Sequence, residues 1–576
     1  MSNFFRDNQD ILFHLKNMDL NSVVSLRENN FAEKQLYLEA PIDLADALDN
    51  YERTLEIIGD IAGEFIAPRA AQVDEDGAEL IDGEVHYAKG TAEALDRLHK
   101  AELMGFTLPR VYGGLNFPKT IYSMAIEMVS RADASLMNIF GLQEIGDTIL
   151  HFGTAEQKQR YLPAFARGET LGAMILTEPD AGSDLPAVAL TAREKDGQWY
   201  LNGVKRFITN GCAQVSLVLA RSEEGVSGAR GLSLLIYRRD ANMRIRRIEN
   251  KLGIHGSPTC ELQFNHAPAE LLGQRRFGLV RYTMSLMNGA RLAVSAQAIG
   301  IAEAAFREAD TYAASRIQFG RTIREFPAVY EMLTDMQINI EAARTLLYET
   351  SRIVDLKESY EEIAEHQPDR KKEEQDEAKR YARYAALFTP VLKAFATEMG
   401  NKVCYDALQI HGGSGYTKDF SVERLTRDMR ITNIYEGTTQ LQIVAAIGGF
   451  MFGVAFERLD EYEKIHDFSA ILDIFKQAQV LRSMLQKVVT FIKEKNDKLY
   501  QDYHERRVVE LGTDVLLSYL LCLDALKTDR KKMVAHIFIG KALARAHASM
   551  EVILSNDRSI LEFHTEIIGK NCKTKQ

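Results

Sequence analysis

The chain has 576 residues, of which 46% are hydrophobic and 26% charged, a composition that excludes a disordered protein. Its 70 basic and 81 acidic residues give a formal net charge of −11, so no overall basic field draws it to nucleic acid. The length predicts about four domain-sized units. Only 12 residues are proline and none follows Pro390, which permits long helices in the C-terminal part.

Cysteine usage and the N-terminus bear on the compartment. The five cysteines are sparse, odd in number and free of CxxC spacing, which is typical of a reducing compartment rather than a disulfide framework. The N-terminal segment mixes charges of both signs and lacks the basic stretch and apolar core of a signal peptide. The apolar stretch Val515–Leu526 is too short and too polar to span a bilayer. We therefore expect a cytoplasmic protein.

The spacing of apolar residues divides the first half of the chain into three parts. Residues 1–40 form a polar N-terminal arm with one short amphipathic stretch. Residues 41–169 show helical spacing, with Ser135–His151 expected as one helix, and predict an N-terminal helical domain. Residues 170–280 consist of short apolar runs separated by Asp-Gly and Asn-Gly turns, and predict a middle β domain.

After residue 280 the helical patterns resume and lengthen. Residues 281–455 carry sustained periodicity and predict a helical-bundle domain, with Ser421–Phe456 expected as one helix. The charged stretch Lys357–Arg380 is expected to be a solvated helix end and a helix–helix loop. Residues 456–576 contain three more helical segments and predict an extra C-terminal helical domain. The fold class is therefore mainly α with a central β domain.

Common cofactor and catalytic motifs are missing from the sequence. No GxGxxG follows a strand and opens a helix, and no GxxxxGK[ST] occurs, so a standard dinucleotide or P-loop site lacks support. The histidines show no HExxH or paired-ligand spacing, so no metal site is expected. A GxSxG nucleophile elbow is also absent. The chemistry must come from other segments.

Two candidate segments lie in the expected β domain. Leu176–Asp184 has small and hydroxyl residues that could offer hydrogen bonds to a polar ring or a phosphate, although an ordinary turn explains it equally well alone. Leu201–Gly211 holds two Asn-Gly turns around a short strand, and alone it predicts a simple meander.

Three more segments lie in the expected bundle. In Arg316–Arg321 a helix gives way to a Phe-Gly turn, where Arg316 could bind a pyrophosphate or simply lie on the surface. Gln409–Tyr416 places a glycine cluster inside helical sequence, which indicates close approach of the backbone to a ligand or to another helix. In Ile434–Gln440, Glu436 stands beside a glycine at a helix start, where it could face a cleft or act as a helix-dipole partner.

Taken together, the five segments match the acyl-CoA dehydrogenase family in order and spacing, and the chain resembles that family over about residues 45–450. Thr177–Asp184 and Gln409–Gln440 correspond to its hallmark segments. The resemblance implies an N-terminal helical domain, a middle β-barrel or sandwich and a C-terminal four-helix bundle. The two ends of the chain look like the 3-methylmercaptopropionyl-CoA dehydrogenase-like subgroup, which carries an additional C-terminal helical domain.

The resemblance also implies a cofactor and a set of site residues. FAD would be held by Met174, Leu176, Thr177, Ser183, Phe207, Thr209, Arg316, Phe319, Gln409, Gly412, Gly413, Thr438 and Gln440. Within that set, the FAD of a neighbouring subunit would be held by Arg316, Phe319, Gln409, Gly412 and Gly413. The implied substrate residues are Ser183, Asn288, Arg291, Tyr435 and Gly437, and the implied catalytic base is Glu436.

The implied reaction is the α,β-dehydrogenation of an acyl-CoA thioester, as in fatty acid β-oxidation. The base would take the α-proton while a hydride passes from Cβ to flavin N5, giving a trans-2-enoyl-CoA, and an electron-transferring flavoprotein would accept the electrons. Some members carry the base on an earlier helix, but Leu286–Arg291 holds no carboxylate here, which leaves Glu436. One departure is Pro327, which stands where many members carry a glutamine that contacts FAD.

Two other functions on the same fold remain open at this stage. An acyl-CoA oxidase would pass the electrons to oxygen. A DNA-associated flavoprotein would need a basic surface, which the net charge disfavours apart from small clusters such as Arg530–Lys532, and no nucleic acid partner is expected. The resemblance implies a homodimer or homotetramer, and long-chain relatives use a C-terminal helical extension for dimerisation or membrane contact.

Overall fold

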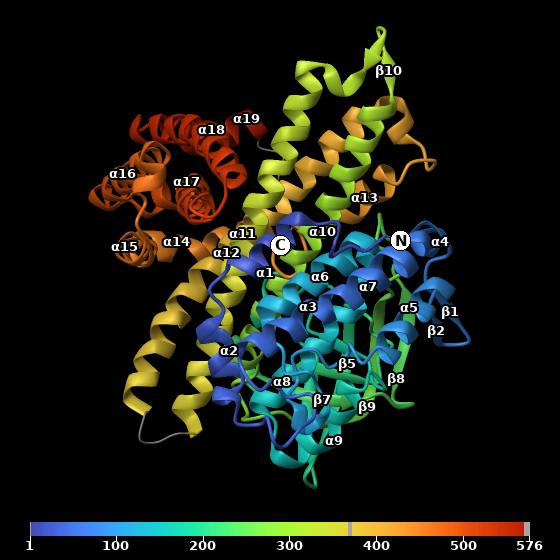
Figure 1. The fold of residues 1–576 in the computed structure, drawn as a ribbon. Coiled ribbons are helices and arrows are strands. Elements are labelled where there is room, and N and C mark those ends of the chain that lie inside the picture. The colour runs from blue at the N-terminus through green and yellow to red at the C-terminus, as the bar shows by residue number, and fades with distance from the viewer. Residues whose placement is uncertain (1, 367–370, 570–576) are drawn as a thin grey trace. The chain divides into compact units, whose positions relative to one another are not determined.

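The computed structural model describes residues 2–366 and 371–569 (Figure 1). The expected extra C-terminal domain therefore includes residues 570–576, which lie outside the described part. The chain forms two compact units. The first comprises Met1–Tyr381 and Ala396–Thr438, and the second comprises Ala382–Phe395 and Thr439–Gln576.

The N-terminal part of the first unit is helical, as expected. Its helices are α1 (Gln9–Asn17), α2 (Asn21–Arg27), α3 (Leu44–Asp60), α4 (Ala70–Asp76), α5 (Lys89–Lys100), α6 (Lys119–Ala132), α7 (Ala134–Phe140), α8 (Ile145–Phe152) and α9 (Ala155–Ala166), with a small hairpin of β1 (Glu79–Ile81) and β2 (Glu84–His86). Local capping fixes several starts: the Asp43 side chain accepts from the Asp46 N–H, and Thr154 forms a capping box with Gln157.

The single helix expected over Ser135–His151 is wrong. A 3-10 turn, Gly141–Glu144, separates α7 from α8. At this turn the chain lies against α10 (Met284–Ser315), where a Cβ on Gly141 would lie 3.9 Å from Ala293 Cβ. Packing against another helix therefore redirects a segment whose apolar spacing alone predicts one helix.

The middle domain is a closed β structure. Its strands are β3 (Gly172–Ile175), β4 (Thr191–Lys195), β5 (Gln198–Thr209), β6 (Val215–Arg221), β7 (Leu232–Arg238), β8 (Met243–Ile248) and β9 (Thr259–Leu271). The strand order is β3-β6-β4-β5-β9-β7, and β6 also pairs with β7, so five strands close into a ring. Successive residues of β6 alternate between two hydrophobic clusters, which explains its nearly unbroken apolar run.

The meander expected around Asn202-Gly203 is wrong, because β5 runs through both residues without turning back. The pairing with β9 shifts its register between Leu201 and Gly203, which marks a β-bulge. Gly203 has φ of 140°, and a Cβ there would lie 3.1 Å from Leu190 Cα. Asn-Gly here bends a strand instead of ending it. The second Asn-Gly, Asn210-Gly211, does lie in a turn.

Long helices follow the β domain, as the sustained apolar periodicity after residue 280 predicts. α10 is followed by a short hairpin of β10 (Ile317–Gln318) and β11 (Arg321–Thr322), and then by α11 (Pro327–His366), α12 (Lys371–His411) and α13 (Val422–Met429). α12 continues through Pro390. The charged stretch Lys357–Arg380 contains the end of α11 and the start of α12, as expected, with residues 367–370 outside the described part.

The single helix expected over Ser421–Phe456 is wrong. α13 ends at Met429 and the next helix begins at Thr439, with an irregular segment between them. Glu436 has φ of 53° and Gly437 has φ of 91°, values that a right-handed helix does not accommodate. The break places Glu436 on a loop.

The second unit is helical. Beside residues 382–395 of α12 it contains α14 (Thr439–Met451), α15 (Val454–Ile465), α16 (Leu472–Lys495), α17 (Lys498–Ala525), α18 (Asp529–Leu554) and α19 (Ser559–Ile568). α17 is its buried centre, since a Cβ on Gly512 would meet the Phe450 ring at 2.3 Å. Among the described residues no single helix has the length and hydropathy that a membrane span needs, although α14 and α15, bent by 62° at their junction, reach it together.

Candidate active site

The end of β3 and the bulged part of β5 lie side by side and bring together the first group of expected site residues. Met174, Leu176 and Thr177 stand at the C-terminal end of β3. The buried ammonium of Lys205 donates to the Leu176 carbonyl at 2.6 Å, and the Arg206 N–H donates to the Thr177 carbonyl at 3.0 Å. These bonds fix the first segment against the second.

A second bulge in β5 exposes the Phe207 side chain to solvent. The β5–β9 register shifts between Lys205 and Ile208, and Phe207 has φ of 60°. Without the bulge Lys205 and Phe207 would share one face of the strand. Instead Lys205 and Ile208 are buried, while half of Phe207 is exposed. A bulky residue in the left-handed region is strained, and such strain gathers at functional sites.

A buried ion pair supports this edge. The Lys205 Nζ lies 2.9 Å from Glu178 Oε1, and the Glu178 carboxylate also accepts the N–H groups of Ala189 and Leu190. Burial lowers the pKa of Lys205 to about 8, although Glu178 opposes the shift. The pair therefore holds the turn after β3 in place from inside the domain.

Three hydroxyl groups complete this first group. Thr177 and Thr209 are half-buried at the ends of β3 and β5, and Ser183 is exposed in the loop between β3 and β4. Within residues 2–366 and 371–569, none of these hydroxyls has a hydrogen-bond partner. They are free to bind a polar ligand.

The second group surrounds Glu436. The backbone of Glu436 and Gly437 is left-handed at two successive residues, a conformation that costs about 1–3 kcal/mol per non-glycine residue. Burial lowers the pKa of the Arg291 guanidinium, and the negative charge of Glu436 opposes that shift. The carboxylate of Glu436 therefore lies close enough to Arg291 to interact with its charge.

Neighbouring side chains position Arg291 and the loop that carries Glu436. Asn288 is exposed on α10, one turn before Arg291, and its Oδ1 accepts from the Arg291 guanidinium at 3.0 Å. The Arg291 Nε is buried and has no partner in the described chain. The Tyr435 hydroxyl donates to Gln297, and the Gln297 amide donates to Asn138 and to the Ala134 carbonyl. Burial, together with the charge of Glu436, raises the pKa of Tyr435. This network anchors the loop that carries Glu436.

The third group lies at the far end of α10. Arg316 follows the helix, and Phe319 is 94% exposed at the tip of the β10–β11 hairpin with φ of 52°. Tyr312, also at this end, stacks on His411 at the end of α12 with 4.3 Å between ring centroids. Gln409, Gly412 and Gly413 are exposed beside it, and no described atom lies within 4 Å of a Cβ built on either glycine.

Arg316 lies 25 residues after Arg291, or about 37 Å along the helix. The structure thus separates the expected site residues into two distant regions of one chain. Thr438 adjoins the Glu436 loop, whereas Gln440 on α14 donates to Glu505 within the second unit.

Models of the acyl-CoA dehydrogenase family match four consecutive parts of the chain. The N-terminal domain model matches residues 50–169, the middle domain model matches residues 173–267 and the C-terminal domain model matches residues 280–447. A further model, described as the acyl-CoA dehydrogenase C terminal, matches residues 452–558. The chain belongs to the acyl-CoA dehydrogenase family.

Individual relatives agree with this assignment. The acyl-CoA dehydrogenase of Bacillus subtilis is 36% identical over 393 residues, which cover 67% of this chain and 94% of that protein. The 3-methylmercaptopropionyl-CoA dehydrogenase of Ruegeria pomeroyi is 35% identical over 433 residues, which cover 70% of each protein. The solved butyryl-CoA dehydrogenase of Megasphaera elsdenii is 30% identical, with a TM-score of 0.59 over 70% of this chain and 98% of that one. The expected family and fold class are confirmed, and the chain is a flavin-dependent oxidoreductase of this class.

Some residues of the site are not apparent from the sequence. The ion pair of Lys205 with Glu178 and the anchors of Tyr435, namely Gln297 and Asn138, are single polar residues in apolar or turn segments. Gln297 stands alone in an otherwise small and apolar stretch of α10, and that isolation is the only signal of its role. Contacts between distant segments give these residues their function.

Proposed function

We propose that the chain oxidises an acyl-CoA thioester to a trans-2-enoyl-CoA, with Glu436 as the base that removes the α-proton and FAD as the cofactor. The observation that carries this proposal is the strained loop that presents Glu436 beside the buried guanidinium of Arg291. Relatives of this chain include an acyl-CoA dehydrogenase and a 3-methylmercaptopropionyl-CoA dehydrogenase.

The first group of residues fits the flat, polar ring of a flavin. The exposed Phe207 ring offers a stacking surface, and Thr177, Ser183 and Thr209 offer unpartnered hydroxyls around it. Met174 and Leu176 add an apolar edge at the end of β3. When bound, FAD supplies the acceptor for the hydride that leaves Cβ. The Lys205–Glu178 pair would keep this edge rigid from behind.

The residues around Glu436 suit the removal of a weakly acidic proton. A thioester α-proton needs a positioned carboxylate and a polarised carbonyl. The anchored Tyr435 keeps Glu436 in place. In the family's arrangement the backbone N–H of the base residue helps to polarise the thioester carbonyl. Arg291, Asn288 and Gly437 would line the acyl-CoA. Exclusion of water on acyl binding would make the base a better proton acceptor, because desolvation disfavours a carboxylate.

The third group supports a cofactor shared between subunits. Arg316, Phe319 and the glycine cluster lie about 37 Å along α10 from Arg291, so one cofactor in one chain does not reach both regions. We infer that these exposed residues bind the FAD of a second copy, in a homodimer or a homotetramer. Reduced FAD would then pass its electrons to an electron-transferring flavoprotein.

The direct test replaces Glu436 by glutamine. Glu436→Gln should still bind FAD and acyl-CoA, but anaerobic flavin bleaching by acyl-CoA should fall by at least about 10³-fold, because the amide cannot accept the proton. Stopped-flow absorbance measures the rate. The exposed Glu308→Gln, on α10, is the matched control and should bleach at the wild-type rate. A Glu436→Gln protein that bleaches normally would disprove the base assignment.

The two other functions are separated by simple assays. The reduced flavin of an acyl-CoA oxidase would be reoxidised rapidly in air. The reduced flavin of a dehydrogenase would react slowly with oxygen and be reoxidised by the flavoprotein acceptor. A DNA-associated protein would shift DNA in a salt-dependent manner, because phosphate contacts weaken steeply with salt. We expect slow air reoxidation and no shift, and the opposite result in either assay would favour that alternative.

A further inference from the structure

Glu144 is a buried carboxyl group beside the helix that carries the substrate residues. It ends the 3-10 turn Gly141–Glu144, which lies against the start of α10. A Cβ built on Gly289 would lie 3.3 Å from Glu144 Oε2 and 3.8 Å from its Oε1. Gly289 and Ala290 are only half-buried, and they stand between Asn288 and Arg291. The carboxyl group therefore faces the space left by the missing side chain of Gly289.

Glu144 is unpartnered although it is 91% buried. Among the described residues, no hydrogen-bond donor or acceptor binds its side chain. Both carboxyl oxygens keep a small solvent-accessible surface. The nearby cation, Lys119, is already engaged, with its Nζ 3.0 Å from Glu358 and 3.5 Å from Asp147. Asp147 also accepts from the Thr107 hydroxyl at 2.9 Å. Lys119 and Asp147 thus have other partners, whereas no described residue binds the Glu144 side chain.

The surrounding charges determine the state of this carboxyl group. Burial raises the pKa of Glu144 to about 8; Lys119 opposes the shift, and Asp147 and Glu358 add to it. At neutral pH the group therefore carries its proton most of the time and acts as an O–H donor as well as an acceptor. Asp147 and Glu358 also make the location unfavourable for a second anion.

We propose that Glu144 recognises a polar substituent on the acyl chain, so that the site prefers acyl-CoA thioesters with an uncharged hydroxyl or keto oxygen beyond the reacting Cα–Cβ bond. The oxygen would form a hydrogen bond with the Glu144 carboxyl group above Gly289. A purely alkyl chain leaves that carboxyl group unsatisfied, which a site built for a hydrogen bond penalises. This inference rests on the proposed acyl-CoA dehydrogenase function and specifies its substrate class.

The test measures binding without turnover. In the FAD-loaded Glu436→Gln protein, calorimetry gives the Kd of octanoyl-CoA and of its hydroxylated derivatives, with the hydroxyl moved along the chain from the γ carbon to the ω carbon. We expect one hydroxylated derivative to bind about tenfold more tightly than octanoyl-CoA. Adding Glu144→Leu should remove or reverse that preference, whereas adding Glu144→Gln, which keeps hydrogen-bonding ability, should keep most of it.

A matched control distinguishes recognition from a general effect of the charged cluster. Asp147→Asn changes the same cluster without touching Gly289, and it should leave the hydroxyl-to-alkyl Kd ratio unchanged. Equal affinities throughout, or a preference that survives Glu144→Leu, would overturn this inference and leave the proposed function intact. If no acyl-CoA binds the Glu436→Gln protein or bleaches the wild-type flavin, the proposed function fails and this inference fails with it. Tighter binding of an ω-carboxyl chain would also overturn it.

Discussion

The fold imposes an unusual backbone conformation or protonation state on several single residues of this protein. Glu436 and Phe207 both have a left-handed backbone, and half of the Phe207 side chain is exposed. Glu144 holds a proton because burial and two neighbouring carboxylates disfavour its charge. A buried group with a shifted pKa also links stability to pH.

The free energy of unfolding should fall as the pH rises toward 8. The folded protein keeps the Glu144 proton up to a pKa of about 8, whereas the unfolded chain releases it near the ordinary value of 4.5. The folded state thus binds more protons in between, and its stability decreases across that range. Urea titrations at several pH values should show the decrease, and Glu144→Gln should flatten it between about pH 6 and 8.

A second buried carboxyl group serves as the control for that titration. Burial raises the pKa of Asp428 to about 6, so Asp428→Asn should change the pH dependence below about pH 6 and leave the upper range as in the wild type. Measurements stop at pH 8 because Lys205, with a pKa of about 8, adds an opposite slope above it. An unchanged slope in Glu144→Gln would show that Glu144 is ionised in the folded protein.

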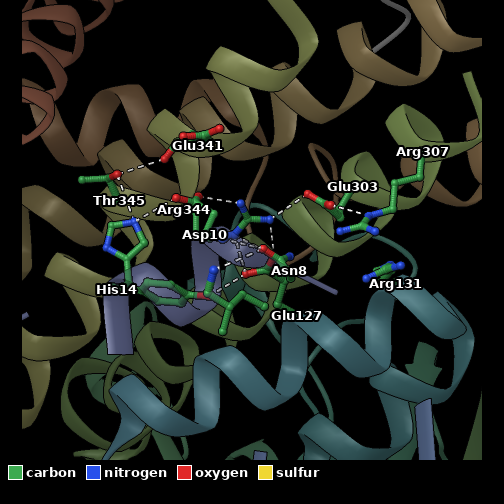
Figure 2. A network of polar contacts seen from close by, with 12 residues as sticks. Asn8, Asp10, His14, Glu127, Arg131, Glu303, Arg307, Glu341, Arg344 and Thr345 are labelled. Carbon is green, nitrogen blue, oxygen red and sulfur yellow. Dashed lines mark hydrogen bonds and ion pairs between the residues drawn. The ribbon is translucent and has the colours of Figure 1, made fainter. Parts of the chain in front are cut away.

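At the scale of elements, one guanidinium joins four helices of the first unit (Figure 2). Arg344 on α11 is fully buried, 2.6 Å from Asp10 on α1, 2.7 Å from Glu127 on α6 and 2.9 Å from Glu303 on α10. Glu303 also pairs with Arg307 at 2.6 Å. Ion pairs of Arg344, in addition to apolar packing, therefore connect the N-terminal arm to α6, α10 and α11.

Removing that guanidinium should destabilise the first unit strongly. Arg344→Met leaves three buried carboxylates without their shared cation, which should cost about 3–5 kcal/mol in the free energy of unfolding. Denaturant titration by circular dichroism measures it. Arg307→Met, at a site one-third exposed, should cost less than about 1 kcal/mol. Similar values for the two variants would show that the network contributes no special stability.

At the scale of the whole molecule, the second unit is not built from the C-terminal residues alone. It takes residues 382–395 from the middle of α12, where the Tyr384 hydroxyl donates to Glu461 at 2.6 Å. Leu387 packs so closely on α14 that a Cβ on Gly449 would lie 2.7 Å from it. The chain thus enters this unit, leaves it and returns, so the C-terminal helices complete a core that an earlier helix begins.

Truncation should reveal that dependence. Ending the chain after Phe452 removes the partner of Tyr384 and the α17 helix that covers Phe450, so the soluble yield and the Tm should both fall. Ending it after Arg558 removes α19, in which no residue is buried, and should change the free energy of unfolding by less than about 0.5 kcal/mol. Equal Tm values for the two truncations would contradict the shared core.

The sequence by itself determined the order of helical and β parts, the family and the residues of its hallmark segments. Apolar periodicity and glycine-rich turns are local properties, so the long helices α10, α11 and α12 and the strands β6 and β7 could be predicted from them. The family resemblance singled out Arg291 and Phe207, and it chose between the two interpretations of Glu436 that the local pattern left open.

Only the tertiary structure decided where those local patterns break and which residues act together. The interruption at Gly141–Glu144, the bulges of β5 and the loop at Glu436 arise where one segment packs on another, which spacing within a segment does not encode. For the same reason Lys205 with Glu178, Gln297 with Tyr435 and Glu144 with Gly289 could not be paired from the sequence. Each pair joins residues far apart in the chain, and only folding brings them into contact.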